Sequence, residues 1–151
     1  MTKNLFKTPK IWLTPDVCRE LFEIFRKKIE FDEPIPAFDT RFPGRLESII
    51  NSVSQGYKGR YFNSTVLEAA VAYFNQLVRG HAFENGNKRI AVLFTDFFLW
   101  SNFVEFTLSW QEMYHFAVLV AQAGEKNISF EETKKLCRKI IGEFTMDLPK
   151  R

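Results

Sequence analysis

The sequence predicts a single all-α domain, a compact bundle of helices around one buried central helix with a short β-hairpin flap. Apolar residues recur at helical spacing along most of the chain, and residues 90–100 are apolar on almost every side. The chain has 151 residues, of which 46% are apolar and 17 are Phe. This composition is enough for one hydrophobic core and too little for two, so residues 1–151 are expected to form one domain.

The first helix is expected to begin after Thr14. A threonine side chain can accept a hydrogen bond at a helix start, and Pro15 suits the first turn because its missing N–H is harmless there. The apolar stripe of this helix would be formed by Val17, Leu21, Ile24, Phe25 and Ile29. Residues 31–44 contain three prolines and are expected to be an extended surface connection. A short helix over residues 46–53 would follow.

A small hairpin or irregular flap is expected next, because two glycines are interspersed with aromatic and polar residues. The segment consists of Gln55, Gly56, Tyr57, Lys58, Gly59, Arg60, Tyr61 and Phe62. The following helix would be capped by Ser64 or Thr65 and would carry an apolar stripe from Val66 to Val78. Gly80 is expected to adopt the left-handed conformation that ends many helices.

Three more helices complete the expected bundle. The apolar segment from Ile90 to Trp100 would be the buried central helix. The second is expected to run from just after Ser109 to about Ala123. The third would open with a capping box formed by residues 129–132 and would end at Gly142.

Charge and cysteine content exclude several classes of protein. A net charge of +3, with both signs spread along the sequence, is too weak for a protein whose affinity for nucleic acid comes from phosphate neutralisation. A helical nucleic-acid-binding protein that uses Lys88 and Arg89 is disfavoured for this reason. Cys18 and Cys137 lack metal-ligand spacing and are expected to be reduced, packed thiols. No signal peptide or membrane span is recognisable, so a cytoplasmic protein without a membrane partner is expected.

Residues 81–89 are the most distinctive stretch, with the sequence His-Ala-Phe-Glu-Asn-Gly-Asn-Lys-Arg just ahead of the central helix. That helix would start near Asn87, so the N–H groups of its first turn and the positive end of its dipole would face the loop. Gly86 lets a phosphate oxygen approach the main chain, and Lys88 and Arg89 add positive charge. Histidine is the residue type best suited to proton transfer near neutral pH, so His81 can take a proton from an attacking hydroxyl.

Each of these residues also has a purely structural interpretation. A lone histidine after a helix is more often a capping or solvated residue than a base. A Lys-Arg pair at a helix start is usually solvated, and Gly86-Asn87 alone would be an ordinary turn. Phe83 is interpreted as an apolar anchor that fixes the loop to the core. The combination favours a phosphate site next to a proton acceptor.

The pattern His-x-Phe-x-x-Gly-Asn-x-Arg in residues 81–89 resembles the signature of the Fic/Doc proteins, which transfer part of a nucleotide to a hydroxyl of a target protein. The segment Pro43-Gly44-Arg45-Leu46-Glu47-Ser48 resembles one that is common in the Doc, or death-on-curing, branch. The resemblance covers roughly residues 14–141. It implies a Fic-type helical bundle around the buried central helix.

The resemblance also implies a role for each residue of the loop. His81 would be the general base on a Ser, Thr or Tyr hydroxyl of the target. Phe83 would be the loop anchor, Gly86 and Asn87 would supply an anion hole, and Arg89 would hold triphosphate oxygens. The nucleotide would be ATP or another nucleoside triphosphate.

Lys88 indicates the Doc branch, because the nucleotidyl-transferring members have glycine at this position. In the Doc branch the lysine crowds the anion hole and the triphosphate is thought to bind reversed, so that the γ-phosphate meets the hydroxyl. The implied reaction is phosphorylation, as by a kinase, rather than AMPylation. Val92 stands where many nucleotidyl transferases carry an arginine, which also favours the Doc branch.

Asn85 departs from the family pattern, in which an Asp or Glu before the glycine helps to hold Mg²⁺. A neutral amide oxygen is a poorer ligand for this cation, which usually takes only one or two protein groups. Glu84 is one residue away and would serve only if the loop shifted. The metal dependence of transfer is therefore left open by the sequence.

By the same resemblance, the flap over residues 55–62 would pair with an extended stretch of the target and hold it beside His81. The alternative is a solvent-facing hairpin with its aromatic side chains packed on the core. Some family members carry an inhibitory Ser/Thr-x-x-x-Glu-Gly/Asn helix; Ser64 and Glu68 have this spacing, but Ala69 follows. A separate antitoxin is therefore expected, bound as a helix in a groove near the N-terminal helix.

The leading hypothesis from the sequence is a Doc-like toxin that phosphorylates a hydroxyl on a protein of the translation machinery. AMP transfer of the Fic type is one alternative. Another is a non-catalytic binding module that has kept the fold and lost the chemistry at Asn85.

Overall fold

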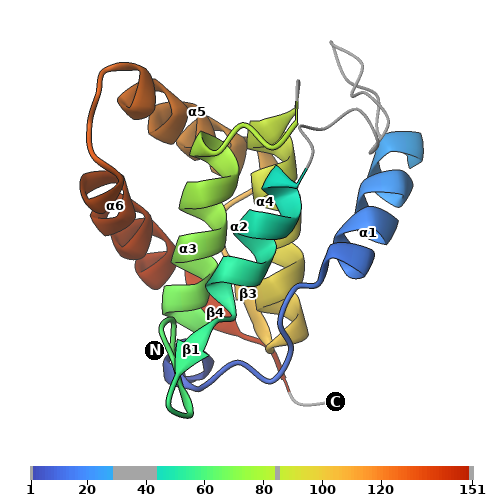
Figure 1. Cartoon of the computed structure of the whole chain (residues 1–151), viewed down its shortest axis with the longest axis vertical. Coiled ribbons are helices and arrows are strands. Elements are labelled where there is room, and N and C mark those ends of the chain that lie inside the picture. The colour runs from blue at the N-terminus through green and yellow to red at the C-terminus, as the bar shows by residue number, and fades with distance from the viewer. Residues whose placement is uncertain (1, 29–43, 84–85, 150–151) are drawn as a thin grey trace.

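Two antiparallel helices, α3 (Val66–Arg79) and α4 (Asn87–Ser101), form the centre of the molecule (Figure 1). The computed structural model describes residues 2–28, 44–83 and 86–149. Eleven of the 14 residues of α3 are buried, against seven of the 15 residues of α4. The helix over residues 90–100 is central, as predicted, but α3 is the more deeply buried of the two.

The remaining elements surround this pair. Figure 1 shows α5 and α6 on one side of it and α1 on the other, with α2 in front. The 3-10 helix η1 is the first element in the chain. Their bounds are η1 Lys3–Phe6, α1 Pro15–Lys28, α2 Arg45–Val53, α5 Trp110–Glu125 and α6 Phe130–Glu143. The all-α class and the expected order of helices are confirmed, whereas the predicted extended connection over residues 31–44 lies almost entirely outside the described residues.

Helix α1 starts where the sequence predicts but buries a different stripe. The Val17 N–H donates to the Thr14 hydroxyl at 3.2 Å, which confirms the cap. The buried side chains are those of Cys18, Phe22 and Phe25, whereas Ile24 is 54% exposed. The predicted stripe was therefore wrong at Ile24 and overlooked Phe22, because the helix is rotated so that the 18, 22, 25 series faces the core.

The caps of the two C-terminal helices differ from those that the sequence predicts. The reciprocal capping box is at Ser109 and Glu112, at the start of α5. At the start of α6, the Ser129 hydroxyl accepts from the Glu132 N–H, but the structure gives no return bond from the Glu132 side chain. Helix α6 ends at Glu143, one residue beyond the predicted Gly142.

A small antiparallel ladder that the sequence did not predict joins the C-terminal segment to the body. Strand β3 (Val104–Phe106) pairs with β4 (Thr145–Asp147) in the register Val104↔Asp147. The Thr2 hydroxyl donates to the Thr145 carbonyl, and the Asp147 carboxylate accepts from the N–H groups of Lys3 and Asn4. Three-residue strands carry too little alternation to be read from a sequence, so these contacts between distant segments were missed.

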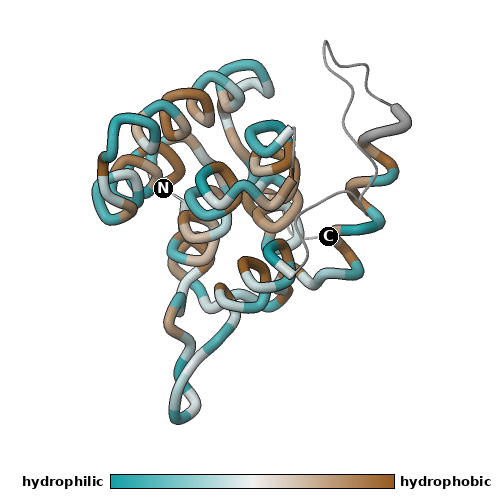
Figure 2. Tube along the Cα trace, turned by 45° about the horizontal axis from the view of Figure 1, so that its top comes forward, coloured by the Kyte–Doolittle hydropathy of each residue, from teal (hydrophilic) through white to brown (hydrophobic). Residues whose placement is uncertain are grey.

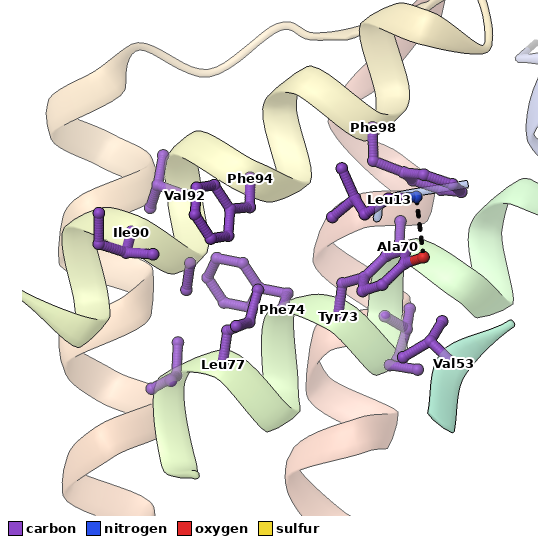
Figure 3. Packing of buried hydrophobic residues seen from close by; sticks show 14 of the residues in the cluster. Leu13, Val53, Ala70, Tyr73, Phe74, Leu77, Ile90, Val92, Phe94 and Phe98 are labelled. Atoms are coloured by element: carbon purple, nitrogen blue, oxygen red, sulfur yellow. Dashed lines mark hydrogen bonds between the residues drawn. The ribbon is translucent and has the colours of Figure 1, made fainter. Parts of the chain in front are cut away.

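The core is continuous from α1 to α6 and is rich in aromatic pairs (Figure 3). Tyr73 of α3 packs edge-on against Phe98 of α4, with ring centroids 4.9 Å apart. Its hydroxyl accepts a hydrogen bond from the Leu13 N–H at 3.2 Å, so the buried oxygen has a partner. Burial raises the pKa of Tyr73 well above its usual value. Within the described residues, no helix combines the length and the apolar character that crossing a bilayer requires.

Cys18 and Cys137 should be unreactive in the folded protein. Both thiols are free and buried, and burial raises the pKa of each from 9.0 to about 12. Since only the thiolate is a nucleophile, Ellman's reagent at pH 8 should label neither cysteine until denaturant is added, after which both should react. If one equivalent of thiol reacted in the native protein, one of the two cysteines would not be buried.

The same two groups make stability depend on pH. A raised folded-state pKa stabilises the fold fully below the unfolded pKa of 9.0, and this contribution is lost as the pH rises towards about 12. The urea midpoint should therefore fall across this window. In a Cys18→Ala variant the urea midpoint should fall less over the same pH range. A fall equal to that of the wild type would mean that groups other than Cys18 cause it.

Candidate functional site

The loop between α3 and α4 begins with an unusual backbone conformation. Gly80 has φ of −82° and is right-handed, whereas His81 has φ of +50° and is left-handed. The prediction that Gly80 is the left-handed residue was therefore wrong. Glycine is favoured there for another reason: a Cβ atom on Gly80 would lie 2.5 Å from the Gln76 backbone oxygen of α3 and 2.7 Å from Cδ1 of Ile49 in α2. The glycine lets α2 approach the end of α3 closely.

His81 follows this close contact and is exposed. Arg45, at the start of α2, donates from its guanidinium to the Gly80 carbonyl at 3.1 Å. This bond fixes the residue immediately before His81. The imidazole is thus on the surface, where the hydroxyl of another protein can reach it, and its backbone is held from one side by α2.

Phe83 lies where a loop anchor should lie. Its side chain is only 3% exposed, and its ring stacks on Phe22 of α1 with centroids 5.1 Å apart and planes 4° from parallel. Burying a phenylalanine side chain stabilises the structure by about 2 kcal/mol relative to leaving it in water. The middle of the loop is therefore fixed to the core two residues beyond the exposed histidine.

Asn87 closes the loop through its side chain. Its Oδ1 accepts from the Phe83 N–H at 3.0 Å, and its Nδ2 donates to the Phe83 carbonyl at 2.8 Å. The side-chain amide therefore has partners on both of its ends. Asn87 can therefore contribute to an anion hole only through its backbone N–H. The role expected from the sequence is limited to this group.

The start of α4 provides the groups that an anion would need. Gly86 is the N-cap residue with φ of +81°, a conformation that favours glycine, and no side chain caps the helix there. The Ile90 N–H donates a hydrogen bond to the Gly86 carbonyl. The N–H groups of Asn87 and Lys88 precede it and have no acceptor within the helix, and the helix dipole adds positive potential at this end.

The cationic side chains of this turn are less exposed than a solvated pair would be. Lys88 and Arg89 are both partly buried at the start of α4. Glu84 and Asn85 lie outside the described residues, and so does the predicted metal contact of Asn85. Among the residues that are described, no three His, Cys, Asp or Glu side chains are grouped as metal ligands.

The hairpin β1 (Gly56–Tyr57) and β2 (Arg60–Tyr61) forms as predicted but lies far from this loop. It leads into the first turn of α3, whereas His81 follows the last turn (Figure 1). A helix of 14 residues is about 21 Å long, so the whole of α3 separates the two. The structure does not bring the hairpin beside His81, and the expectation that it holds a target there is corrected. Nor are all its aromatic side chains packed on the core, since Tyr57 and Phe62 are well exposed.

Two supporting residues of the site were overlooked in the sequence. Arg45 holds the Gly80 carbonyl, and Phe22 supports Phe83. The first has a signal, since Arg45 belongs to the Pro-Gly-Arg segment that the resemblance singled out without assigning it a role. The second had none, because a phenylalanine in an amphipathic helix does not reveal which ring it meets.

Comparison with known proteins agrees with the arrangement of these elements. A model of the Fic/DOC family matches residues 12–99, more than half of the chain, from the residues before α1 to the last turns of α4. The match includes the whole loop over residues 81–89. A search of curated proteins gave no significant match.

The left-handed backbone at His81 has a measurable consequence for stability. His81→Gly and His81→Ala both remove the imidazole, but only glycine adopts a positive φ without strain. The glycine variant should therefore be the more stable of the two by about 1 kcal/mol in urea unfolding.

The same pair of substitutions at Lys135, exposed in the middle of α6, provides the control. There the order should be reversed, with alanine more stable than glycine by about 1 kcal/mol, because glycine is a poor helix former. If alanine were also the more stable residue at position 81, the left-handed conformation would carry no strain.

Proposed function

The chain belongs to the Fic/DOC family of nucleotide-using transferases, and on that premise we propose that it transfers a phosphoryl group from a nucleoside triphosphate to a hydroxyl of a target protein. ATP is the simplest candidate for the nucleotide. The target would be a protein of the translation machinery, and the chain would act as a toxin in the cytoplasm.

One observation carries the proposal. An exposed imidazole and the start of a central helix are the two ends of one short loop, and the loop is fixed between them by Phe83 and Asn87. A base and an anion-binding turn that are held together in this way can serve the same phosphate group. A solvated histidine on a free loop would not need either support.

His81 takes the role of general base in this proposal. The neutral imidazole accepts the proton of the target hydroxyl as the hydroxyl oxygen forms its bond to the γ-phosphorus. The bond between this phosphorus and the bridging oxygen breaks, and the nucleoside diphosphate leaves with that electron pair. The first-turn N–H groups of α4 and the charge of Lys88 stabilise the negative charge on the phosphate oxygens.

Lys88 supports phosphoryl rather than nucleotidyl transfer. It is the second residue of α4 and is partly buried, so its side chain takes up space at the mouth of the anion site. A glycine at this position would leave that space to the nucleotide. AMP transfer of the Fic type is the alternative reaction, and Lys88 is the residue that disfavours it.

A divalent cation, when bound, would neutralise phosphate oxygens and orient the triphosphate. Asn85 is the residue that the family pattern places next to such an ion, and its amide offers a neutral oxygen in place of a carboxylate. No step above depends on the cation. If the amide has abolished turnover, the chain would be a binding module that holds a nucleotide or a partner helix.

A toxin of this kind needs a restraint. The spacing of Ser64 and Glu68 matches an inhibitory helix, but Ala69 follows and is buried in α3. We therefore include a separate antitoxin in the proposal, bound as a helix near α1, whose exposed Ile24 provides an apolar contact.

The reaction is tested with ATP labelled at either the γ- or the α-phosphate, in a lysate supplemented with the purified protein. Label should pass to a protein from the γ position, and His81→Ala should reduce the transfer by about a hundredfold or more, because a positioned base contributes that much. Transfer from the α position would change the reaction to AMPylation. Undiminished transfer by His81→Ala would remove the base from the proposal.

Asn85→Asp tests the metal contact separately. Restoring a carboxylate should tighten Mg²⁺-dependent binding of ATP, measured by calorimetric titration with and without the cation. The matched control is Asn127→Asp in the exposed turn between α5 and α6, which should leave the titration unchanged. Equal binding by the wild type and Asn85→Asp would mean that position 85 does not contact the metal.

A further inference from the structure

The end of the molecule opposite His81 gathers positive charge without any acid in the same segments. Residues 2–15 and 51–67 contain no Asp or Glu, and their basic residues are Lys3, Lys7, Lys10, Lys58 and Arg60. These five charges exceed the net charge of +3 for the whole chain, so the rest of the chain is net negative. The weak overall charge therefore hides a local basic region.

The two segments are neighbours in the structure. The Val66 N–H, at the start of α3, donates to the Lys7 carbonyl at 2.8 Å. The Trp12 ring packs against Tyr61 of the hairpin, with centroids 4.8 Å apart. The N-terminal segment thus runs along the base of the hairpin, and we call the combined region the basic end. Acids border it: Asp16 and Glu68 follow directly after the two segments, and the Asp147 carboxylate accepts from the N–H groups of Lys3 and Asn4.

Aromatic rings are exposed among these cations. Tyr57 is 67% and Phe62 is 68% exposed, and the hairpin that carries them projects from the helical body (Figure 2). The Lys58 ammonium lies over the Tyr57 ring, 5.4 Å from its centroid. Exposed rings contribute little to the stability of a two-strand hairpin. Most of both side chains is therefore open to a ligand, apart from the part of the Tyr57 ring beneath the Lys58 ammonium.

A cavity of about 240 Å³ lies between the N-terminal segment, the first residue of α3 and residues 102–103. Lys7, Thr8 and Lys10 line one part of it, and Asn102 and Phe103 line another. The Asn102 side chain is fully used, since its Oδ1 accepts from the N–H groups of Lys10 and Ile11 and its Nδ2 donates to two carbonyls. The lysines are the charged groups of this cavity, and in the described part of the chain neither forms an ion pair, so they suit an anion such as a phosphate.

From this juxtaposition we infer that the basic end binds single-stranded nucleic acid, with bases stacked on Tyr57 and Phe62 and phosphates bound by Lys7, Lys10, Lys58 and Arg60. Cations interleaved with exposed aromatic rings are the usual surface for single strands, because every base has a face that can stack. An acidic peptide would use the charge but not the rings. Strand addition by a peptide is also disfavoured, because β1 and β2 have only two residues each.

Binding is tested by fluorescence anisotropy of the full chain with a labelled single-stranded RNA of about 12 nucleotides, a length within the usual range of single-strand sites. The logarithm of the binding constant should fall with the logarithm of salt concentration with a slope of about −2 to −3, as expected for three or four phosphate contacts. A single-stranded DNA, a duplex of the same length and a polyglutamate peptide are measured in parallel.

Tyr57→Leu and Phe62→Leu keep an apolar side chain but remove the flat ring, and each should weaken binding of the single strand by about tenfold. Lys7→Gln with Lys58→Gln should flatten the salt slope by about one unit or more. The control is Lys135→Gln with Lys139→Gln, two exposed lysines of α6, which should change neither quantity.

Three results would overturn the inference: no measurable binding of single strands at low salt, equal affinity for the duplex with no effect of the leucine variants, or binding of polyglutamate alone. The last would assign the basic end to an acidic protein segment. His81→Ala should bind the oligonucleotide as the wild type does, so a failure of the proposed transferase activity leaves this test unaffected.

Discussion

The hydrogen bonds between the Asn87 side chain and the backbone of Phe83 are the constraint on which the candidate site depends. They join the third residue of the loop to the first residue of α4, so the chain between them is closed into a ring. His81 lies two residues before this ring and the N–H groups of α4 lie directly after it. Without the bonds, the histidine and the helix start would move independently of each other.

The loop segment closed between Phe83 and Asn87 is in turn held by helices that contribute no residue to the proposed reaction. Helix α1 supplies Phe22, which stacks on Phe83, and α2 supplies Arg45, which binds the carbonyl before His81. Phe22 and Phe83 are buried, so changes in the packing of α1 would displace the loop even though α1 contains no reacting group. This arrangement also explains the strain at His81: its left-handed backbone is imposed by neighbours on both sides and is confined to a residue whose side chain must point outward.

Local signals in the sequence predicted the helices, and contacts between distant segments account for what it missed. The chemistry of the loop stays a prediction. Caps at Thr14, Thr65, Ser109 and Ser129 and the apolar periodicity gave the helix starts. Gly80 was misread because the glycine avoids close contacts with the Gln76 carbonyl of its own helix and with Ile49 of α2, and does not supply a positive φ. The hairpin was recognised, but its distance from His81, which follows from the length of the helix between them, was overlooked.

The length of α3 separates the loop at His81 from the basic end. About 21 Å lies between them, while charges in physiological salt are screened beyond about 8 Å. The cations of the hairpin and the N-terminal segment therefore do not hold a nucleotide at His81. Conversely, the loop does not require a basic hairpin, because its own anion site comes from backbone N–H groups and from Lys88 beside them. The charge and exposed rings of the basic end call for a separate explanation, and a second ligand supplies it.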